Sequence, residues 1–424
     1  MPPADLAGWL AFVERAHPST IALGLDRVAE VLERLAIPKF CPIFTVGGTN
    51  GKGSTCAMLE ACLLAAGYRV GTYTSPHLLR FNERVRIGGR DAYDATLAAA
   101  FAAVDGARNG TPLTYFEFGT LAAWAAFAGA RLDALVLEIG LGGRLDAVNA
   151  FEPDCSILTS VDLDHMDYLG ETRERIGWEK AHIFRPGRPA IVADPVPPAT
   201  VLEHAAAIGA QTLAIGRDFG YDGDPTQWRY WGPGGTRSGL AYPALRGANQ
   251  LLNASASIAA LDSVREQLPV SAQAIREGLA LVELPGRFQV LAGRPAVVLD
   301  VAHNPHAAAV LAANLSAMEG FRDTFAVFGM LRDKDIAGVV AKVAPHIDRW
   351  HVASLDTPRG ATAAELAAEI ERLRPDQTVA CFANPREAFA AAREAARPDD
   401  RILVFGSFFT VADVMAARAA PSRS

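Results

Sequence analysis

The sequence lacks the features of membrane, secreted and nucleic-acid-binding proteins. No apolar run is long enough to cross a bilayer, and Met1 to Asp5 have neither the positive charge nor the apolar stretch of a signal peptide. The five cysteines lack the paired spacing of a disulfide framework or a zinc site. A formal net charge of -7 provides no basic excess for a nucleic-acid surface. We therefore expect a cytoplasmic protein that binds neither nucleic acid nor a membrane.

A glycine-rich segment over 46–55 stands between an apolar run and a stretch of helical periodicity. This order predicts a turn between a strand and a helix, where backbone N–H groups and the helix N-terminus face a phosphate. Lys52 would add a mobile cation, and Ser54 or Thr55 could bind magnesium. The spacing departs from G-x-x-x-x-G-K-[ST], because a valine replaces the first glycine and an extra glycine follows the lysine. The pattern favours a variant ATP-binding loop over the alternative, a glycine-rich turn that binds nothing.

Three further polar residues lie at or just beyond the ends of predicted strands. Ser75 and His165 follow such strands, and Glu138 lies within one, where a carboxylate is seldom buried without a partner. Ligands gather at the carboxyl ends of the strands in open α/β sheets, so all three are candidate magnesium ligands. The alternatives are a Ser-Pro turn for Ser75 and a surface or structural histidine for His165. Lys180, on a predicted helix, reads by default as a solvated helix residue.

The first part of the chain alternates between strand and helix patterns. Apolar runs predict strands over 40–46, 68–74, 134–140, 155–161 and 190–194. This alternation is typical of an α/β fold with a doubly wound, mostly parallel sheet. We expect helices within 5–36, a surface loop over 78–85 because three charges interrupt it, and short antiparallel strands within 212–245, which is rich in glycine and aromatics.

A second alternation begins at Pro295. Strands are predicted over 296–299, 325–328, 350–353, 379–382 and 402–405, with helices between them. This part has no phosphate loop of its own and predicts a smaller, Rossmann-like α/β domain. The expected domains are 1–290, which binds ATP, and 291–424.

Seven motifs, in order along nearly the whole chain, resemble the folylpolyglutamate synthase and dihydrofolate synthase family, relatives of the Mur peptidoglycan ligases. They are Gly48-Thr49-Asn50-Gly51-Lys52-Gly53-Ser54, Thr74-Ser75-Pro76-His77-Leu78, Glu138-Ile139-Gly140-Leu141-Gly142-Gly143-Arg144-Leu145-Asp146, Asp162-Leu163-Asp164-His165, Glu179-Lys180-Ala181, Pro285-Gly286-Arg287-Phe288 and Asp300-Val301-Ala302-His303-Asn304-Pro305.

The resemblance implies a role for each matched residue. ATP would contact Asn50, Gly51, Lys52, Gly53, Ser54, Asn253, Arg287 and Asp300, with His303 beside it. Two magnesium ions are implied, with ligands Ser75, Glu138 and His165, and Lys180 matches a lysine that such enzymes carbamylate. The pterin-bearing substrate would contact Leu25, Asp26, Arg27, Val28, Thr114, Tyr115, Phe116, Glu117, Leu145, Asp146 and Ala147. Lys52, Lys180 and His303 would be the catalytic residues. Phe409 stands where the family has a histidine near the incoming glutamate.

The implied activity is an ATP-dependent amide ligation by a monomer. The substrates would be dihydropteroate, folates and L-glutamate, joined through an acyl phosphate. The segments 145–146 and 162–165 favour a bifunctional enzyme over one that only extends polyglutamate tails. One alternative is a Mur-type ligase acting on a nucleotide-linked peptide, although only about forty residues precede the loop here. Another is a nucleotide-dependent regulatory protein, which would need the phosphate loop but not Glu138, His165 or Lys180.

Overall fold

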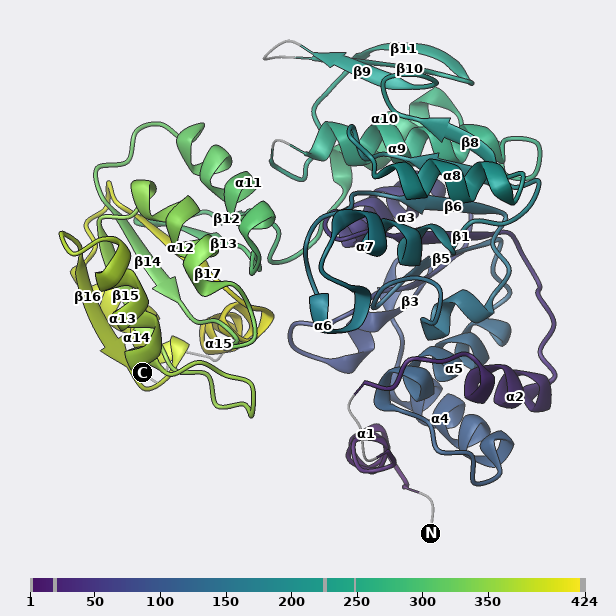
Figure 1. Cartoon of the computed structure of the whole chain (residues 1–424), viewed down its shortest axis with the longest axis horizontal. Coiled ribbons are helices and arrows are strands. Elements are labelled where there is room, and N and C mark those ends of the chain that lie inside the picture. The colour runs from purple at the N-terminus through teal and green to yellow at the C-terminus, as the bar shows by residue number, and fades with distance from the viewer. Residues whose placement is uncertain (1–2, 18–20, 224–226, 248, 420–424) are drawn as a thin grey trace. The chain divides into compact units, whose positions relative to one another are not determined.

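The chain divides into two compact units, each with its own sheet (Figure 1). The structure is a computed structural model that describes residues 3–17, 21–223, 227–247 and 249–419. The first unit comprises Met1–Ala244 and Leu251–Val282, and the second comprises Leu245–Gln250 and Glu283–Ser424. The expected boundary after residue 290 differs from this division. It falls inside β12 (Gln289–Leu291), which pairs with β13 (Ala296–Leu299) and so belongs to the second unit.

The first unit is built on an eight-stranded sheet in the order β4-β3-β2-β5-β1-β6-β7-β8. Its strands are β1 (Ile43–Gly47), β2 (Val70–Tyr73), β3 (Val85–Ile87), β4 (Arg90–Asp91), β5 (Ala134–Glu138), β6 (Cys155–Leu158), β7 (Pro189–Val192) and β8 (Gln211–Ala214). All neighbours are parallel except β2-β3 and β3-β4. The α/β class and the mostly parallel sheet are confirmed.

The helices of the first unit lie before, between and after these strands in the chain. They are α1 (Leu6–Val13), α2 (Asp26–Leu35), α3 (Lys52–Ala65), α4 (Asp94–Arg108), α5 (Tyr115–Ala128), α6 (Met166–Leu169), α7 (Arg173–Ala181), α8 (Ala199–Ala207), α9 (Gln250–Ser263) and α10 (Ala272–Leu281), with 3-10 turns η1 (Phe81–Arg84) and η2 (Ala147–Ala150). The expected helical region 5–36 contains α1 and α2, and its residues 18–20 lie outside the described part of the chain. Within the described ranges we find no helix with the length and apolar character needed to cross a bilayer.

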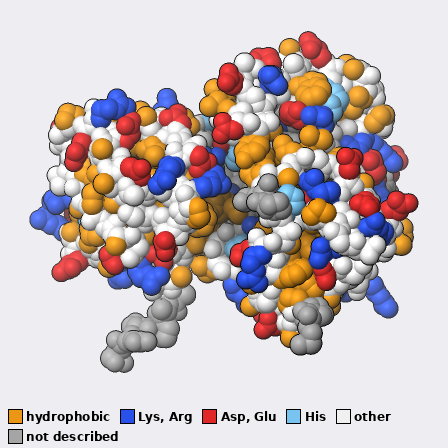
Figure 2. All heavy atoms as spheres, turned by 60° about the horizontal axis from the view of Figure 1, so that its bottom comes forward, with side chains coloured by type: hydrophobic (Ala, Val, Ile, Leu, Met, Phe, Trp, Pro, Cys, Tyr) orange, Lys and Arg blue, Asp and Glu red, His pale blue; other side chains and the backbone are white. Residues whose placement is uncertain are grey.

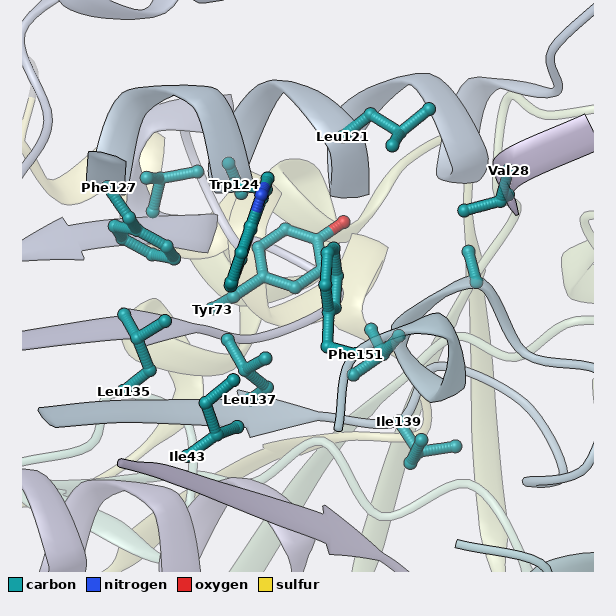
Figure 3. Packing of buried hydrophobic residues seen from close by; sticks show 14 of the residues in the cluster. Val28, Ile43, Tyr73, Leu121, Trp124, Phe127, Leu135, Leu137, Ile139 and Phe151 are labelled. Atoms are coloured by element: carbon teal, nitrogen blue, oxygen red, sulfur yellow. The ribbon is translucent and has the colours of Figure 1, made fainter. Parts of the chain in front are cut away.

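Aromatic side chains fill the space between α5 and the sheet (Figure 3). Trp124 of α5 stacks on Phe151 with ring centroids 4.4 Å apart. Tyr73 at the end of β2 is fully buried, and its hydroxyl is 3.1 Å from Thr120 Oγ1. Leu137 of β5 packs from the sheet side. This core holds α5 in a fixed position relative to the strands.

The segment 78–85 is not the surface loop that its charges suggested. Phe81 is 3% exposed and Val85 is fully buried, and η1 leads directly into β3. The charges are accommodated locally, because the Glu83 carboxylate accepts hydrogen bonds from the backbone N–H groups of Leu78, Leu79 and Arg80. An acidic side chain can therefore stabilise a turn whose neighbours enter the core.

A small antiparallel sheet, in the order β11-β10-β9, packs against α9. Its strands are β9 (Gly220–Gly223), β10 (Trp228–Gly232) and β11 (Gly235–Leu240), which confirms antiparallel strands within 212–245, whereas β8 at the start of that region joins the parallel sheet. Arg237 of β11 donates two hydrogen bonds, of 2.9 and 2.5 Å, to the carboxylate of Asp262 on α9. The two side chains are 14% and 6% exposed, so the ion pair is buried.

Replacing Asp262 with alanine is expected to lower the free energy of unfolding by about 3–5 kcal/mol, because it leaves the Arg237 guanidinium buried without its partner. Urea denaturation measures the change. The paired variant Arg237→Met with Asp262→Leu should recover most of the loss, since no buried charge remains. A loss below about 1 kcal/mol for the single variant would contradict this account.

The second unit has a six-stranded sheet in the order β12-β13-β17-β14-β15-β16. Beyond β12 and β13, its elements are β14 (Thr324–Phe328), β15 (Arg349–Ala353), β16 (Thr378–Phe382), β17 (Arg401–Phe405), α11 (Pro305–Ser316), α12 (Ile336–Val343), α13 (Ala363–Leu373), α14 (Pro385–Ala395), α15 (Phe408–Ala419) and the 3-10 turn η3 (Ala344–His346). The five predicted strands are confirmed, and β12 adds an antiparallel edge.

The surface carries both signs of charge. On the face seen in Figure 2, acidic and basic side chains are interspersed, and hydrophobic side chains lie among them. Steering a polyanion such as nucleic acid needs a face on which positive charge predominates. The mixed charges on the face seen in Figure 2 do not provide one.

Candidate active site

Four parallel strands of the first unit bring the predicted site segments to one edge of the sheet. Their order is β2-β5-β1-β6, and Val46 of β1 is in register with both Glu138 of β5 and Ile157 of β6. The phosphate-loop segment follows β1, Ser75 lies two residues after β2, and His165 lies in the segment after β6. Since carboxyl ends of parallel strands share an edge, residues as far apart in the sequence as Asn50 and Ser160 become neighbours in space.

Two glycines form the turn of the phosphate-loop segment, and any larger residue at either position would force neighbouring atoms to move. Gly48 has φ +144° and Gly51 has φ +88°. A Cβ on Gly48 would lie 1.9 Å from Thr159 Oγ1, and a Cβ on Gly51 would lie 2.7 Å from Asn253 Oδ1. The chain then enters α3 at Lys52, so the free N–H groups of the first helical turn adjoin the loop. Asn50 precedes Gly51 in this turn, Gly53 and Ser54 lie in the first turn of α3, and the Asn253 side chain of α9 lies against Gly51.

Two residues that sequence reasoning missed, Thr159 and Ser160, hold the loop. Ser160 Oγ accepts from Asn50 N at 3.0 Å, and Thr49 N donates to Ser160 O at 2.8 Å. The Thr159 hydroxyl lies 2.7 Å from Asn50 O. The sequence feature that could have pointed to them is a pair of hydroxyl residues directly after a buried apolar strand, next to the 162–165 motif.

Lys52 and Lys180 meet at one backbone carbonyl. Each Nζ donates to Gly48 O at 3.0 Å, and Lys52 Nζ also donates to Thr49 O at 3.1 Å. Lys180 is 5% exposed, so its default interpretation as a solvated residue is wrong. Burial, and next the charge of Lys52, lower the pKa of Lys180 from 10.5 to about 7, against the opposing charges of Asp164 and Asp146. Near neutral pH a large fraction of this side chain is therefore a neutral amine.

Two candidate magnesium ligands, Ser75 and Glu138, lie at the ends of the neighbouring strands β2 and β5, whereas His165 follows β6, on the far side of β1. Ser75 N donates to Glu138 Oε2 at 3.0 Å, and Glu138 is 4% exposed. His165 caps α6 with φ +52°, and its Nε2 is 3.8 Å from Asp164 Oδ2. In the described part of the chain no three His, Cys, Asp or Glu side chains converge into a metal cluster. The serine hydroxyl and the carboxylate supply oxygen ligands of the kind that Mg²⁺ prefers, and phosphate oxygens or a carbamate would add more. The imidazole of His165 is a nitrogen ligand, which transition-metal ions bind more readily than Mg²⁺ does.

The three candidate substrate segments lie together. Arg27 Nη2 donates to Glu117 Oε1 at 2.7 Å, and Gly24 N donates to Leu145 O at 3.3 Å. Glu117 also completes a capping box with Thr114 at the start of α5. Burial raises the pKa of Asp146 to about 7, although hydrogen bonds from the Leu141 and Val148 N–H groups and the charge of Lys52 oppose this.

The side chains of these segments differ in access. Val28 and Ala147 are buried in the core, as are Thr114, Glu117 and Asp146. Leu25, Arg27, Tyr115, Phe116 and Leu145 are half-buried, and Asp26 is exposed. The half-buried group can contact a ligand directly, whereas the buried group shapes the segments that carry it.

Arg84, which sequence reasoning placed in a loop, connects two of these regions. Its guanidinium lies 5.4 Å from the centre of the Tyr115 ring, and its Nε donates to His77 Nδ1 at 2.9 Å. Burial, and then the charge of Arg84, lower the pKa of His77 to about 4, so this imidazole is neutral near pH 7. Arg84 therefore ties the turn after Ser75 to the start of α5. The sequence did not reveal this role of Arg84, because a segment with several charges resembles a solvent-exposed loop.

In the second unit, the remaining predicted residues gather after β13 and β17. Asp300 accepts from the N–H groups of Phe288 and Ala302 at 2.8 and 2.7 Å, and burial raises its pKa against the charge of Arg287. The Arg287 guanidinium lies 5.0 Å from the Phe408 ring centre, and the His303 ring centre is 6.3 Å from the same ring. Phe409 is 50% exposed. Arg287, which lies just before β12, therefore gathers with Asp300, His303 and Phe408 at the carboxyl edge of this sheet.

Comparison with known proteins identifies both units. The Mur ligase middle domain family matches residues 46–221, and the Mur ligase glutamate ligase domain family matches residues 286–408. The chain is 45% identical over 413 residues to the dihydrofolate synthase/folylpolyglutamate synthase of Escherichia coli (strain K12), covering 97% of this chain and 95% of that protein.

Solved structures agree. E. coli FolC in complex with DHPP and ADP has a TM-score of 0.94 at 44% identity, covering 99% of each chain. A bifunctional folylpolyglutamate synthase/dihydrofolate synthase with Mn, AMPPNP and L-glutamate bound has a TM-score of 0.90 at 44% identity, covering 99% of this chain and 100% of that chain. The resemblance seen in the seven motifs is confirmed. This chain belongs to the dihydrofolate synthase/folylpolyglutamate synthase family within the Mur ligases.

Proposed function

We propose that this protein joins L-glutamate to dihydropteroate and to the glutamate tail of reduced folates, with ATP as the energy source. The observation that carries the proposal is the meeting of Lys52 and Lys180 at Gly48 O, at the sheet edge that also holds Glu138. This arrangement places the Lys52 cation and the Lys180 amine at one carbonyl of the glycine-rich turn that we assign to the ATP phosphates, in an otherwise acidic chain. The family relationship supports ATP and a folate-type acid as the ligands.

The chemistry follows from these residues. A carboxylate resists attack by an amine until one oxygen becomes a good leaving group. Lys52 and the N–H groups of the 46–55 segment hold the γ-phosphoryl group as it passes from ATP to a substrate carboxylate oxygen, which yields an acyl phosphate and ADP. The glutamate amine attacks the acyl carbon, an amide bond forms, and inorganic phosphate leaves with the former carboxylate oxygen. Arg287 would add charge neutralisation, and His303 is the third proposed catalytic residue.

We assign the metal site to Ser75, Glu138, His165 and a carbamate on Lys180. Two magnesium ions, when bound, would neutralise phosphate charge and orient the transferring group. Asn50 to Ser54, Asn253, Arg287 and Asp300 are the proposed nucleotide contacts. The pterin-bearing substrate is assigned to 25–28, 114–117 and 145–147. We further propose a monomeric protein, a cytoplasmic location, and an ATP-binding domain that is followed in the chain, between residues 282 and 290, by a glutamate-ligase domain.

An assay of amide formation tests the function. Dihydropteroate, L-glutamate, Mg²⁺ and ATP should give dihydrofolate and stoichiometric phosphate, and tetrahydrofolate in place of dihydropteroate should give a diglutamate. Product only from the folate would indicate a monofunctional enzyme. Turnover only with UDP-linked peptides would indicate a Mur-type ligase. Absence of amide product in every mixture would favour a regulatory nucleotide-binding protein.

The Lys180 amine should react with CO₂ in a pH-dependent way. Only the neutral amine attacks CO₂, so at fixed dissolved CO₂ the carbamate occupancy should rise as the pH increases through about 7, the pKa of Lys180, and fall below it. Carbon-13 NMR with labelled CO₂ measures the occupancy, and Lys180→Arg should lack the signal. Occupancy that begins to rise only near the ordinary lysine pKa of about 10.4 would contradict the lowered pKa.

A further inference from the structure

The segment that leads to the substrate residues 145–147 rests directly on the backbone of Lys180. A Cβ on Gly143 would lie 2.7 Å from Glu179 O, and 2.9 Å from both Lys180 Cα and Lys180 O. These are backbone atoms of α7, which cannot turn aside as a side chain can. The φ of Gly143 lies outside the left-handed region, so lack of space, and not backbone conformation, requires glycine here.

The next residue, Arg144, stabilises this contact through hydrogen bonds to Glu179. Arg144 N donates to Glu179 O at 3.0 Å, and Arg144 Nη2 donates to Glu179 Oε1 at 3.0 Å. The guanidinium also reaches Glu179 through Nε, at 3.1 Å to Oε2. Backbone and side chain thus hold the same glutamate, and Glu179 is the residue directly before Lys180. A fork-shaped pair of this kind sets geometry as well as charge.

A second pair of polar side chains closes the arrangement from the other side. Asn149 Nδ2 donates to Arg144 O at 3.3 Å and to His182 O at 3.2 Å. Arg185 Nη2 donates to Asn149 O at 2.9 Å and to Asn149 Oδ1 at 3.1 Å. The substrate segment and the end of α7 are therefore joined before and after Lys180. We call Gly143, Arg144, Asn149, Glu179 and Arg185 the 143–185 bracket.

Each side of the bracket carries a group that the proposed reaction needs. On one side, Leu145 O accepts from Gly24 N, next to the candidate substrate residues 25–28. On the other, Lys180 Nζ donates to Gly48 O of the phosphate loop. We propose that Gly143 is a positioning residue, and that the 143–185 bracket places Lys180 and the 145–147 substrate segment as one rigid piece. This inference rests on the proposed function for the roles of those two parts.

Gly143→Ala tests the proposal, because one added methyl must push the substrate segment and Lys180 apart. We expect kcat/KM for dihydropteroate to fall at least about tenfold, with KM for ATP changed less than about threefold, since the atoms nearest to the added methyl belong to α7 and not to the 46–55 segment. Gly106→Ala is the matched control, because no atom lies within 4 Å of a Cβ at that exposed position in α4. Unchanged kinetics in Gly143→Ala would overturn the proposal.

Chemical labelling of lysines tests the bracket without an activity assay, so its result does not depend on whether the proposed function is correct. Lys180 is buried and Lys342 is exposed, so the rate of acetylation of each, followed by peptide mass spectrometry, reports the position of Lys180. In Gly143→Ala the ratio of Lys180 to Lys342 labelling should rise at least about fivefold over wild type. An unchanged ratio would overturn the bracket even if the wild type proved to have another activity. A raised ratio with no ligation in wild type would refute only the function.

The charge pair provides a second variant in case Gly143→Ala fails to fold. Glu179→Gln removes the ion pair at constant size, and we expect the same direction of change in kcat/KM and in Lys180 labelling, by about threefold or more. The swapped pair Arg144→Glu with Glu179→Arg should restore labelling toward the wild-type ratio. A variant that lowers only the melting temperature, with kcat/KM and labelling unchanged, would reduce the bracket to a stabilising contact and overturn its positioning role.

Discussion

Replacing Lys52 with methionine should lower kcat for amide formation by about 10²–10³-fold, even at saturating ATP. Methionine keeps the length and apolar stem of lysine but removes the only mobile cation of the phosphate-loop segment 46–55. The charge it removes is the one expected to stabilise the transferring phosphoryl group. Steady-state phosphate release with dihydropteroate and glutamate measures the effect, and Lys342→Met on α12 is the matched control.

Lys52→Met has a second expected effect, which distinguishes the loss of a positive charge from misfolding of the variant. Because the charge of Lys52 helps to lower the pKa of Lys180, its removal should raise that pKa and shift carbamate occupancy to higher pH. Retained turnover in Lys52→Met at saturating ATP would contradict the role assigned to this residue. A loss of turnover accompanied by a changed circular dichroism spectrum would instead point to misfolding.

Lys180→Ala should lower kcat/KM at least about 10²-fold and should be partly rescued by short carboxylic acids. The side chain is buried, so its removal leaves a space beside Gly48 O. If carbamylation turns this lysine into a metal-binding carboxylate, acetate or propionate can occupy the space and supply the missing oxygens. Amide formation measured against acid concentration should then rise and saturate.

Lys52→Met is the control for this rescue, since an added acid cannot replace a cation. Lys180→Arg gives a second control, because it keeps a positive charge but cannot carry a carbamate. Rescue of either variant to the same extent as Lys180→Ala would show that the acids act elsewhere. No rescue of Lys180→Ala would remove the support for a carbamate while leaving the family membership unchanged.

Local sequence patterns predicted the elements that show a regular hydrophobic period or a glycine-rich turn. The strand pattern, the glycine turn before Lys52 and the two-part organisation are all of this kind. Prediction was weakest where charge and burial coincide. Glu83 and Arg84 made 78–85 resemble a solvated loop, yet their polar atoms bind backbone and His77 while Phe81 and Val85 enter the core.

The sequence by itself determined the α/β class, the glycine-rich turn before α3 and the family, because these depend on residue types at short, regular spacings. Only the tertiary structure decided that Lys180 is buried beside Lys52, that Thr159 and Ser160 hold the loop, and that Gly143 lies on α7. Such contacts join residues that are distant in the chain. They depend on strand order and register, which arise from packing of the whole sheet and leave no local pattern in the sequence.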